Sequence, residues 1–444
     1  MSFFSLPTES APQETGIGGV RVDEISPISS INPNGGGTVA FEMTSPANSY
    51  FVPRLSYWNF RLRVTKTSSG TALAASDGVV TDYATSITAG GVQFKSNPIA
   101  NIVNTIGHQI NGVSVETVSN VPECAAILNR TSLTHEYLRS SGGSMHRLVG
   151  YDGARNSSVA APGQALQPWN GGITVWDCAF VPPSGFFSMA GGLPGGRHRF
   201  VMTLNSGIRD RVLMMGAARA ALIAGDYVSL TIESITLHAT HMIPDQPTPI
   251  PRNVVLSLHP MTVVMSQLPA STGNTTHTLS VPPSTDRLFV CVNLQSAGSS
   301  TQIQDCHDAF EPSLSQLQVQ YAGLTLPQSQ YTDTGSDSSE RQVLKPYADY
   351  LAASGRMYYE TSSYDAVNDW MLRPIFGFSF EKATNDTSTN VIVRMTRTNA
   401  GLYETTNGAI AAANLIVAAQ SHIAVVLTYG DDGLISSCDS VVEL

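Results

Sequence analysis

Gln109-Ile-Asn-Gly-Val-Ser-Val115 and Gln320-Tyr-Ala-Gly-Leu-Thr-Leu326 are two copies of one pattern, in which Gln-x-x-Gly is followed by alternating apolar residues. After each copy comes a helical pattern that ends in an acidic residue followed by Tyr-Leu-x-x-Ser-Gly. Roughly thirty residues separate the glycine of each copy from the glycine of this ending. These endings are Glu136-Tyr-Leu-Arg-Ser-Ser-Gly142 and Asp349-Tyr-Leu-Ala-Ala-Ser-Gly355. Because both motifs recur in the same order at nearly the same separation, the chain is predicted to contain a duplicated strand-and-helix unit.

Short runs of alternating apolar and polar residues surround this unit in both halves of the chain. Alternation with a period of two, bounded by Gly, Pro and Asn, is typical of half-buried strands. Helical patterns are few, and the clearest cover about 122–140 and about 340–354. We therefore predict an all-β chain built of sandwiches. The predicted strands include 39–43, 57–64, 108–115, 199–204, 228–237, 254–258, 287–294, 317–321, 376–380, 391–395 and 422–429.

Two segments rich in proline or glycine divide the chain. Residues 1–37 end in Asn32-Pro-Asn-Gly-Gly-Gly37 and are predicted to form an extended arm. Pro244-Asp-Gln-Pro-Thr-Pro-Ile-Pro251 contains four prolines, which cannot donate hydrogen bonds to a sheet. The predicted organisation is the arm over 1–37, a first sandwich over 38–243, a linker over 244–253, and a second sandwich with a short C-terminal tail over 254–444.

The composition of the 444-residue chain favours a surface that packs against neighbouring molecules. Charged residues make up 13% of the chain, roughly half the usual fraction. A weakly charged surface does little to keep copies apart. The net charge is −10, and no run of Lys or Arg is present. Since nucleic-acid binding depends on neutralising phosphates, no direct or sequence-specific binding of nucleic acid is expected.

The cysteines and the N-terminal sequence favour synthesis in a reducing cytosol. Five cysteines without CxxC spacing are predicted to be free thiols. The N-terminus lacks the basic and apolar regions of a secretory signal. No stretch approaches ~20 consecutive apolar residues, so no membrane span is predicted. The cysteines are Cys124, Cys178, Cys291, Cys306 and Cys438.

Three segments contain groups that could bind an ion, and in each case a structural role is favoured. Asp305-Cys-His-Asp308 places four possible ligands in a row, but adjacent ligands cannot easily surround one metal, so an ordinary loop is expected. Gly191-Gly-Leu-Pro-Gly-Gly196, followed by Arg197 and His198, lacks the Gly-Lys-Ser/Thr ending of a phosphate loop and is interpreted as a flexible turn. Asp431-Asp-Gly433 lacks the further carboxylates of a calcium loop and is interpreted as a turn. No metal or cofactor site is predicted.

No catalytic residue is predicted either. Ser206, His198 and Asp210 could supply a nucleophilic triad, but no Gly-x-Ser-x-Gly elbow accompanies them. No pair of carboxylates stands out for glycoside hydrolysis, whose acids are paired in space. The tryptophans are interpreted as core or interface anchors and not as a sugar-binding platform. They are Trp58, Trp169, Trp176 and Trp370.

Three stretches carry a resemblance to a known family. They are residues 97–112, which run from Asn97-Pro to Asn111-Gly112, residues 176–205, which contain Leu193-Pro-Gly, and the strand pattern over 422–430. In that order they resemble double jelly-roll major capsid proteins, which include those of virophages, Polinton-like and adintovirus-like elements, giant DNA viruses and, as a larger relative, adenovirus hexon. The usual aromatic-acidic ending of the last strand is replaced by Tyr429-Gly-Asp-Asp-Gly433, which leaves the subfamily open.

The resemblance implies both a fold and a function. The fold would be two consecutive eight-stranded jelly-roll β-sandwiches with a few short helices in loops. The function would be that of a structural major capsid protein, which assembles as pseudo-hexameric homotrimers into the icosahedral shell of a DNA virus. Implied partners are neighbouring capsomers, penton and minor capsid proteins, and an internal membrane. The protein would be made in the host cell cytoplasm and would reside in the virion.

Two other functions stay open on the sequence. A two-domain β-sandwich that binds or hydrolyses carbohydrate would share the strand pattern, and an accessory penton or fibre protein of a virion would share the composition. Oligomeric state, glycan binding and copy number in particles would separate the three.

Overall fold

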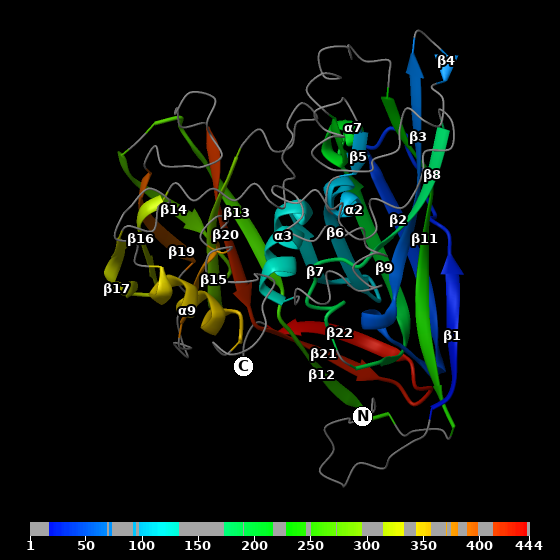
Figure 1. The fold of residues 1–444 in the computed structure, drawn as a ribbon. Helices are drawn as coiled ribbons and strands as arrows, with labels where there is room; N and C mark the ends of the chain where they lie inside the picture. The colour runs from blue at the N-terminus through cyan, green and yellow to red at the C-terminus, as the bar shows by residue number, and fades with distance from the viewer. Residues whose placement is uncertain are drawn as a thin grey trace.

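The two halves of the chain form two sandwiches that stand side by side (Figure 1). The structure is a computed structural model. The residues that it describes are 17–68, 71–72, 92–94, 97–132, 173–189, 191–215, 228–245, 250–271, 273–294, 314–332, 343–356, 370, 374–380, 389–397 and 412–441.

The first sandwich consists of two antiparallel four-stranded sheets. Their strand orders are β1-β11-β3-β8 and β2-β9-β6-β7. The sheets join at one end, where His241 and Met242 of β11 pair with Phe51 and Tyr50 of β2. The strands are β1 (Ile17–Ile25), β2 (Thr38–Phe51), β3 (Tyr57–Ser68), β6 (Val103–Ile110), β7 (Val113–Ser119), β8 (Ile173–Phe180), β9 (Leu193–Leu204) and β11 (Val228–Pro244).

The second sandwich also consists of two antiparallel four-stranded sheets, with the orders β13-β20-β15-β18 and β14-β19-β16-β17. Its strands are β13 (Met261–Leu268), β14 (Gly273–Ser280), β15 (Thr285–Leu294), β16 (Leu314–Tyr321), β17 (Leu324–Thr332), β18 (Phe376–Ser379), β19 (Asn390–Arg397) and β20 (Ala413–Ser421).

The two sandwiches have the same topology. If the eight strands of each are counted in chain order, one sheet in each has the order first, eighth, third, sixth, and the other has the order second, seventh, fourth, fifth. This arrangement of eight strands in two facing sheets is the jelly roll. The predicted all-β fold of two eight-stranded jelly rolls is therefore confirmed, and the duplication extends over every strand of the roll.

The repeated sequence unit is a β-hairpin followed by a helix. Asn111 and Gly112 connect β6 to β7, and Ala322 and Gly323 connect β16 to β17. All four residues have positive φ, between 49° and 85°, which is typical of the tight turns that join antiparallel strands. The prediction of one continuous strand over 108–115 is therefore wrong, because the Asn-Gly pair reverses the chain at that point.

The helix that follows each hairpin lies near the predicted position. Helix α3 (Val121–Ser132) begins close to the predicted start, and the residues after 132 lie outside the described part of the chain. Helix α9 (Leu344–Ala353) is followed closely by Gly355, whose φ of 72° lets the backbone N–H groups of Gly355 and Arg356 bond to carbonyls of the last turn. Both helices are confirmed where the structure describes them.

The prediction that residues 1–37 form an extended arm is corrected by β1. This strand pairs with β11 along its length and is the first of the eight strands of the first roll. Its apolar pattern is weak because it begins at Ile17-Gly-Gly and because none of its residues 18–25 is fully buried: Val20 and Val22 are 60% and 52% exposed. An edge strand with little burial carries little of the hydrophobic signal by which strands are predicted. The other domain boundaries stay predictions.

A separate three-stranded sheet connects the end of the chain to the base of the first roll (Figure 1). It has the order β12-β21-β22, with β12 (Asn253–Leu258), β21 (Ile423–Tyr429) and β22 (Ile435–Val441), and β22 contacts β7 and β9. The remaining short elements are η1 (Pro53–Leu55), β4 (Thr71–Ala72), β5 (Val92–Phe94), α2 (Pro98–Ile102), α7 (Ile208–Val212) and β10 (Leu213–Met215). No helix within the described ranges is long and apolar enough to cross a membrane.

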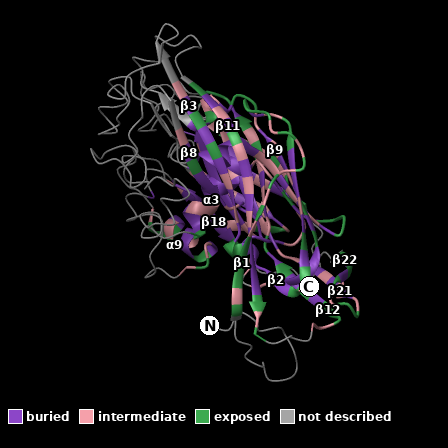
Figure 2. Cartoon of the chain, turned by 90° about the vertical axis from the view of Figure 1, so that its right-hand side faces the viewer, coloured by how far each residue is buried: buried purple, intermediate pink, exposed green. Residues whose placement is uncertain are grey.

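The core is formed by every second residue along the strands, and Figure 2 shows this alternation of buried and more exposed residues along β3 and β11. On β3 the inward side chains of Trp58, Phe60, Leu62 and Val64 are fully buried. The outward Arg61 and Arg63 pair with Glu233 of β11. Three of the four tryptophans, at 58, 176 and 370, are buried, and Trp169 lies outside the described residues. The four cysteines that the structure describes are buried free thiols, as predicted, and Cys306 lies outside the described residues.

Candidate functional site: a polar cluster inside the first roll

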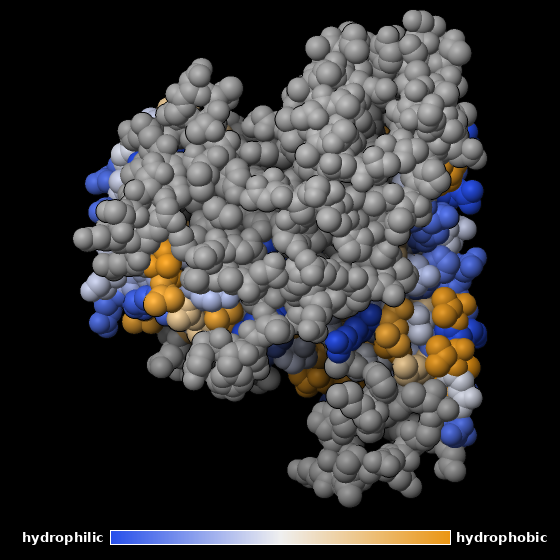
Figure 3. Space-filling view, in the orientation of Figure 1, coloured by the Kyte–Doolittle hydropathy of each residue, from blue (hydrophilic) through white to orange (hydrophobic). Residues whose placement is uncertain are grey.

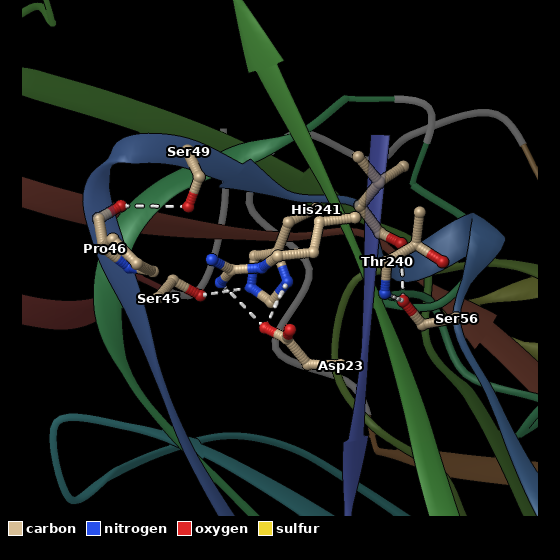
Figure 4. Close-up of polar contacts among 9 residues, drawn as sticks. Asp23, Ser45, Pro46, Ser49, Ser56, Thr240 and His241 are labelled. Atoms are coloured by element: carbon tan, nitrogen blue, oxygen red, sulfur yellow. Dashed lines mark hydrogen bonds and ion pairs between the residues drawn. The ribbon is translucent and has the colours of Figure 1, made fainter. Parts of the chain in front are cut away.

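Three strands of the first roll meet at a cluster of polar side chains (Figure 4). His241 of β11 is 1% exposed and lies between Asp23 of β1 and Ser45 of β2. Its Nδ1 atom is 3.3 Å from Asp23 Oδ2, and its Nε2 atom is 3.2 Å from Ser45 Oγ. Arg21 donates to the same Asp23 carboxylate at 2.8 Å. The cluster therefore joins the edge strand β1 to both sheets of the roll.

The connectivity of Ser45, His241 and Asp23 is that of a Ser-His-Asp triad, but its environment is not that of a catalytic site. A triad needs a nucleophile that a substrate carbonyl can reach. Ser45 is 0% exposed, so its hydroxyl is closed to substrate in this structure. What the arrangement does here is to give Nε2 of a buried histidine a hydrogen-bond partner, and to link three strands to one another through Ser45, His241 and Asp23.

A pair of histidines lies next to this cluster in the core. His108 Nε2 of β6 is 3.2 Å from His198 Nδ1 of β9, and the two rings are stacked with their centroids 5.5 Å apart. Phe51 contacts both His198 and His241, with ring centroids 5.1 and 5.7 Å away. Phe186 lies 3.9 Å from His108, also between ring centroids. The histidines are therefore enclosed by aromatic rings and are removed from water.

Burial controls the protonation of these histidines. It lowers the pKa of His198 to about 3, with a further contribution from the nearby His241. It also lowers the pKa of His108, with a smaller effect of His198, and lowers the pKa of His241 in spite of the opposing effect of Asp23. A desolvated imidazole is favoured in its neutral form, so the three histidines are expected to be neutral at pH 7.

Glu116 of β7 holds the segment that leads into β9. Its carboxylate accepts hydrogen bonds from the backbone N–H groups of Gly185 and Phe186 at 2.8 and 2.9 Å. Burial raises the pKa of Glu116, and these two hydrogen bonds act in the opposite direction. Because Phe186 covers His108, Glu116 positions one wall of the histidine pair.

The structure does not bring together Ser206, His198 and Asp210, the three residues that could have supplied a nucleophilic triad. His198 is buried beside His108, whereas Asp210 lies on α7 and pairs with its neighbour Arg209 at 2.8 Å. Ser206 forms an isolated bridge with Gly35 after the end of β9.

The glycine-rich segment 191–196 is not the flexible turn that was predicted. From Leu193 onward it belongs to β9, and a Cβ atom on Gly195 would lie 2.7 Å from the backbone oxygen of Gly433. Gly195 and Gly196 are needed because β9 passes close to the turn between β21 and β22 and to Ile435, at the start of β22. Asp431 and Asp432 lie in that turn, where Asp432 Oδ1 accepts from the N–H of Leu434 at 3.0 Å. The Asp305–Asp308 segment lies outside the described residues.

Sequence reasoning missed the residues of the cluster themselves. Asp23, Ser45 and His241 come from three strands distant in the chain, so no local motif connects them. A weak signal does exist: His108 occupies an inward position between Ile106 and Ile110 on β6, and a polar residue in such a position needs a partner. That signal identifies the residue but not the partner.

Comparisons with known proteins support the fold. No family model and no curated protein matches the chain. Solved structures do match it over nearly its whole length. A chain from the cryo-EM structure of the Sputnik virophage has a TM-score of 0.59 and 16% identity, with 99% of this chain and 91% of that chain covered. The fold is the double jelly roll.

Two further double jelly rolls are similar. The mavirus major capsid protein has a TM-score of 0.56 and 13% identity, with 99% of this chain and 94% of that chain covered. The Faustovirus major capsid protein has a TM-score of 0.52 and 11% identity, with 95% and 92% covered. At these identities the likeness concerns the fold.

Proposed function

We propose that this double jelly roll is the major capsid protein of an icosahedral DNA virus, and that three copies form a pseudo-hexameric capsomer. The observation that carries the proposal is the complete duplication of one eight-stranded topology within a single chain. Three copies around a threefold axis would place six similar rolls in a ring, and such a unit can tile a flat facet. The structurally similar mavirus and Faustovirus proteins are major capsid proteins, which supports the same function.

Contacts between the rolls support their action as one building block. Tyr350 Oη of α9 donates to the carbonyl of Arg130 at 2.6 Å, and Arg356 donates to the carbonyls of Thr131 and Ser132 at the end of α3. Asn120 donates to the carbonyl of Val263 on β13 at 3.0 Å. Because the two repeated helices meet at the joint, the rolls would enter a capsomer in a fixed mutual orientation.

The surface of the first roll supports packing against neighbours. Apolar side chains appear at the right-hand edge of Figure 3, over β1, where Val20 and Val22 are exposed. The chain has few charges to oppose association. Neighbouring capsomers are therefore the proposed partners of the side faces, and penton proteins, minor capsid proteins and an internal membrane are proposed at the ends. The proposed place of the protein is the virion, after synthesis in the host cytoplasm.

The test is the mass and outline of the purified protein. Light scattering is expected to give three times the 47.2 kDa chain mass, and negative-stain images are expected to show a near-hexagonal outline. A monomer that persists at high concentration would contradict the proposal.

Copy number and glycan binding separate the remaining functions. A major capsid protein is expected to dominate the protein mass of particles, whereas an accessory penton or fibre protein would be scarce. A carbohydrate-binding sandwich would retain glycans on an array. The burial of Trp58, Trp176 and Trp370 disfavours that function, because an aromatic platform for sugars must be exposed.

A further inference from the structure

The duplicated topology allows the two rolls to be compared residue by residue at the histidine pair. Counted back from the two hairpin turns, Ile110 corresponds to Tyr321, and His108 corresponds to Val319. Across the sheet Ile110 faces His198, and Tyr321 faces Val391. The second roll therefore fills both positions with fully buried valines.

Histidine is thus not required by the packing of this fold. Within the described structure, His108 Nδ1 and His198 Nε2 are buried and have no hydrogen-bond partner. Leaving a buried polar atom unpaired destabilises a fold by about 1 to 3 kcal/mol. At these two positions the first roll carries this disadvantage and the second does not.

The groups around His198 disfavour its cation. It faces His108 of β6 and His241 of β11, and each would become a like charge on protonation. Glu116, opposite His108 on β7, uses both carboxylate oxygens for backbone N–H groups. Asp23 and Arg21 lie on the far side of His241 and contact each other. The described structure shows no carboxylate in contact with His198.

We propose that the His108–His198 pair makes the first roll an acid-sensitive element, which opens more readily in mildly acidic solution than the second roll does. The inference concerns the roll itself and goes beyond the proposed capsid function. In a shell built from such chains, acid would destabilise the first roll of each chain more than the second.

The direction follows from proton uptake. The folded state holds His198 neutral down to a pKa of about 3, whereas an exposed histidine takes up a proton near pH 6.5. Between these values the open state binds more protons, so stability is fully present above about pH 6.5 and is lost as the pH falls toward 3. For His198 alone, the opening equilibrium is expected to shift about 30-fold between pH 7.5 and pH 5.

The second roll provides an internal comparison. Its described histidines are His259, His277 and His422, and none is fully buried. Burial lowers the pKa of His277, so a smaller change of the same sign is expected there.

Hydrogen exchange measured by mass spectrometry on the purified full-length protein tests the proposal. After correction for the intrinsic exchange rate, protection of β6 and β9 is expected to fall about 30-fold or more from pH 7.5 to pH 5. Protection of β16 and β19 is expected to fall less than about 5-fold. An equal fall in both rolls, or no fall in the first, would overturn the proposal.

Variants then assign the effect to the pair. The double substitution His108→Val and His198→Val copies the second roll and is expected to reduce the acid response of β6 and β9 to that of β16 and β19. His238→Gln is the matched control, because His238 is a partly exposed histidine stacked on Tyr57 and is expected to leave the response unchanged. An undiminished response in the double variant would refute the assignment.

The reverse change covers the case in which the double variant does not fold. Val319→His with Val391→His places the pair in the second roll and is expected to make β16 and β19 acid-sensitive. If this protein folds at pH 7.5 and its second roll keeps full protection at pH 5, the pair is not the cause.

Discussion

Glu116 shows at the scale of a single residue how a buried acid organises a strand connection. It is 6% exposed, and it satisfies the N–H groups of Gly185 and Phe186 where the chain turns toward β9. An uncompensated carboxylate at this depth would be strongly unfavourable, and the two hydrogen bonds are what make it tolerable. The sequence around Glu116 contains no sign of this role, because its partners are about 70 residues away.

Replacing Glu116 by alanine is expected to destabilise the first roll by about 2 to 4 kcal/mol, since two buried N–H groups lose their acceptor. Urea unfolding monitored by tryptophan fluorescence measures the change. Glu42→Ala is the control, because Glu42 pairs with Arg197 at the surface and its loss is expected to have a much smaller effect. Similar losses for both variants would show that the contacts of Glu116 contribute nothing specific.

At the scale of elements, helix α9 packs against β18 through a glycine. A Cβ atom on Gly377 would lie 2.7 Å from Ala353 Cβ and 2.9 Å from Tyr350 Cα. Tyr350 and Ala353 are fully buried and face the sheet at this point. The helix can approach β18 this closely only because position 377 has no side chain.

Gly377→Ala is therefore expected to push α9 away from the sheet and to destabilise the second roll by about 1 to 3 kcal/mol. Thermal unfolding followed by circular dichroism gives the magnitude, and hydrogen exchange in α9 gives the location. Gly191→Ala is the matched control, since a Cβ atom there meets nothing within 4 Å. Unchanged protection of α9 in Gly377→Ala would contradict the role assigned to the glycine.

At the scale of the whole molecule, the two rolls are joined by backbone contact as well as by side chains. A Cβ atom on Gly185 of the first roll would lie 2.9 Å from backbone atoms of His259, just before β13 of the second roll. Glu116 fixes this same glycine from the other side. The joint between the rolls and the wall of the histidine pair are thus one continuous piece of structure.

Gly185→Ala is expected to separate the rolls slightly and to weaken their coupling. In scanning calorimetry the wild-type protein is expected to unfold in one transition, and the variant in two partly resolved transitions. Gly19→Ala on β1 is the control, because a Cβ atom there meets nothing within 4 Å. Two transitions in the wild type would show that the rolls are already independent.

The sequence by itself determined the strand-rich character, the duplication, and the helices that follow the two hairpins, because these depend on local periodicity and turn chemistry. It also indicated the core on β3, where Trp58, Phe60, Leu62 and Val64 alternate with polar residues. It placed β1 wrongly in an arm, since an edge strand with exposed valines has little hydrophobic pattern.

Only the tertiary structure decided which polar residues meet. Asp23, Ser45 and His241 are brought together by β1, β2 and β11, and His108 and His198 by the pairing of β6 with β9. The physical reason is that strand pairing in a jelly roll joins residues far apart along the chain, whereas sequence patterns report only the period and burial of each strand. The same pairing shows that two valines in one roll correspond to two histidines in the other.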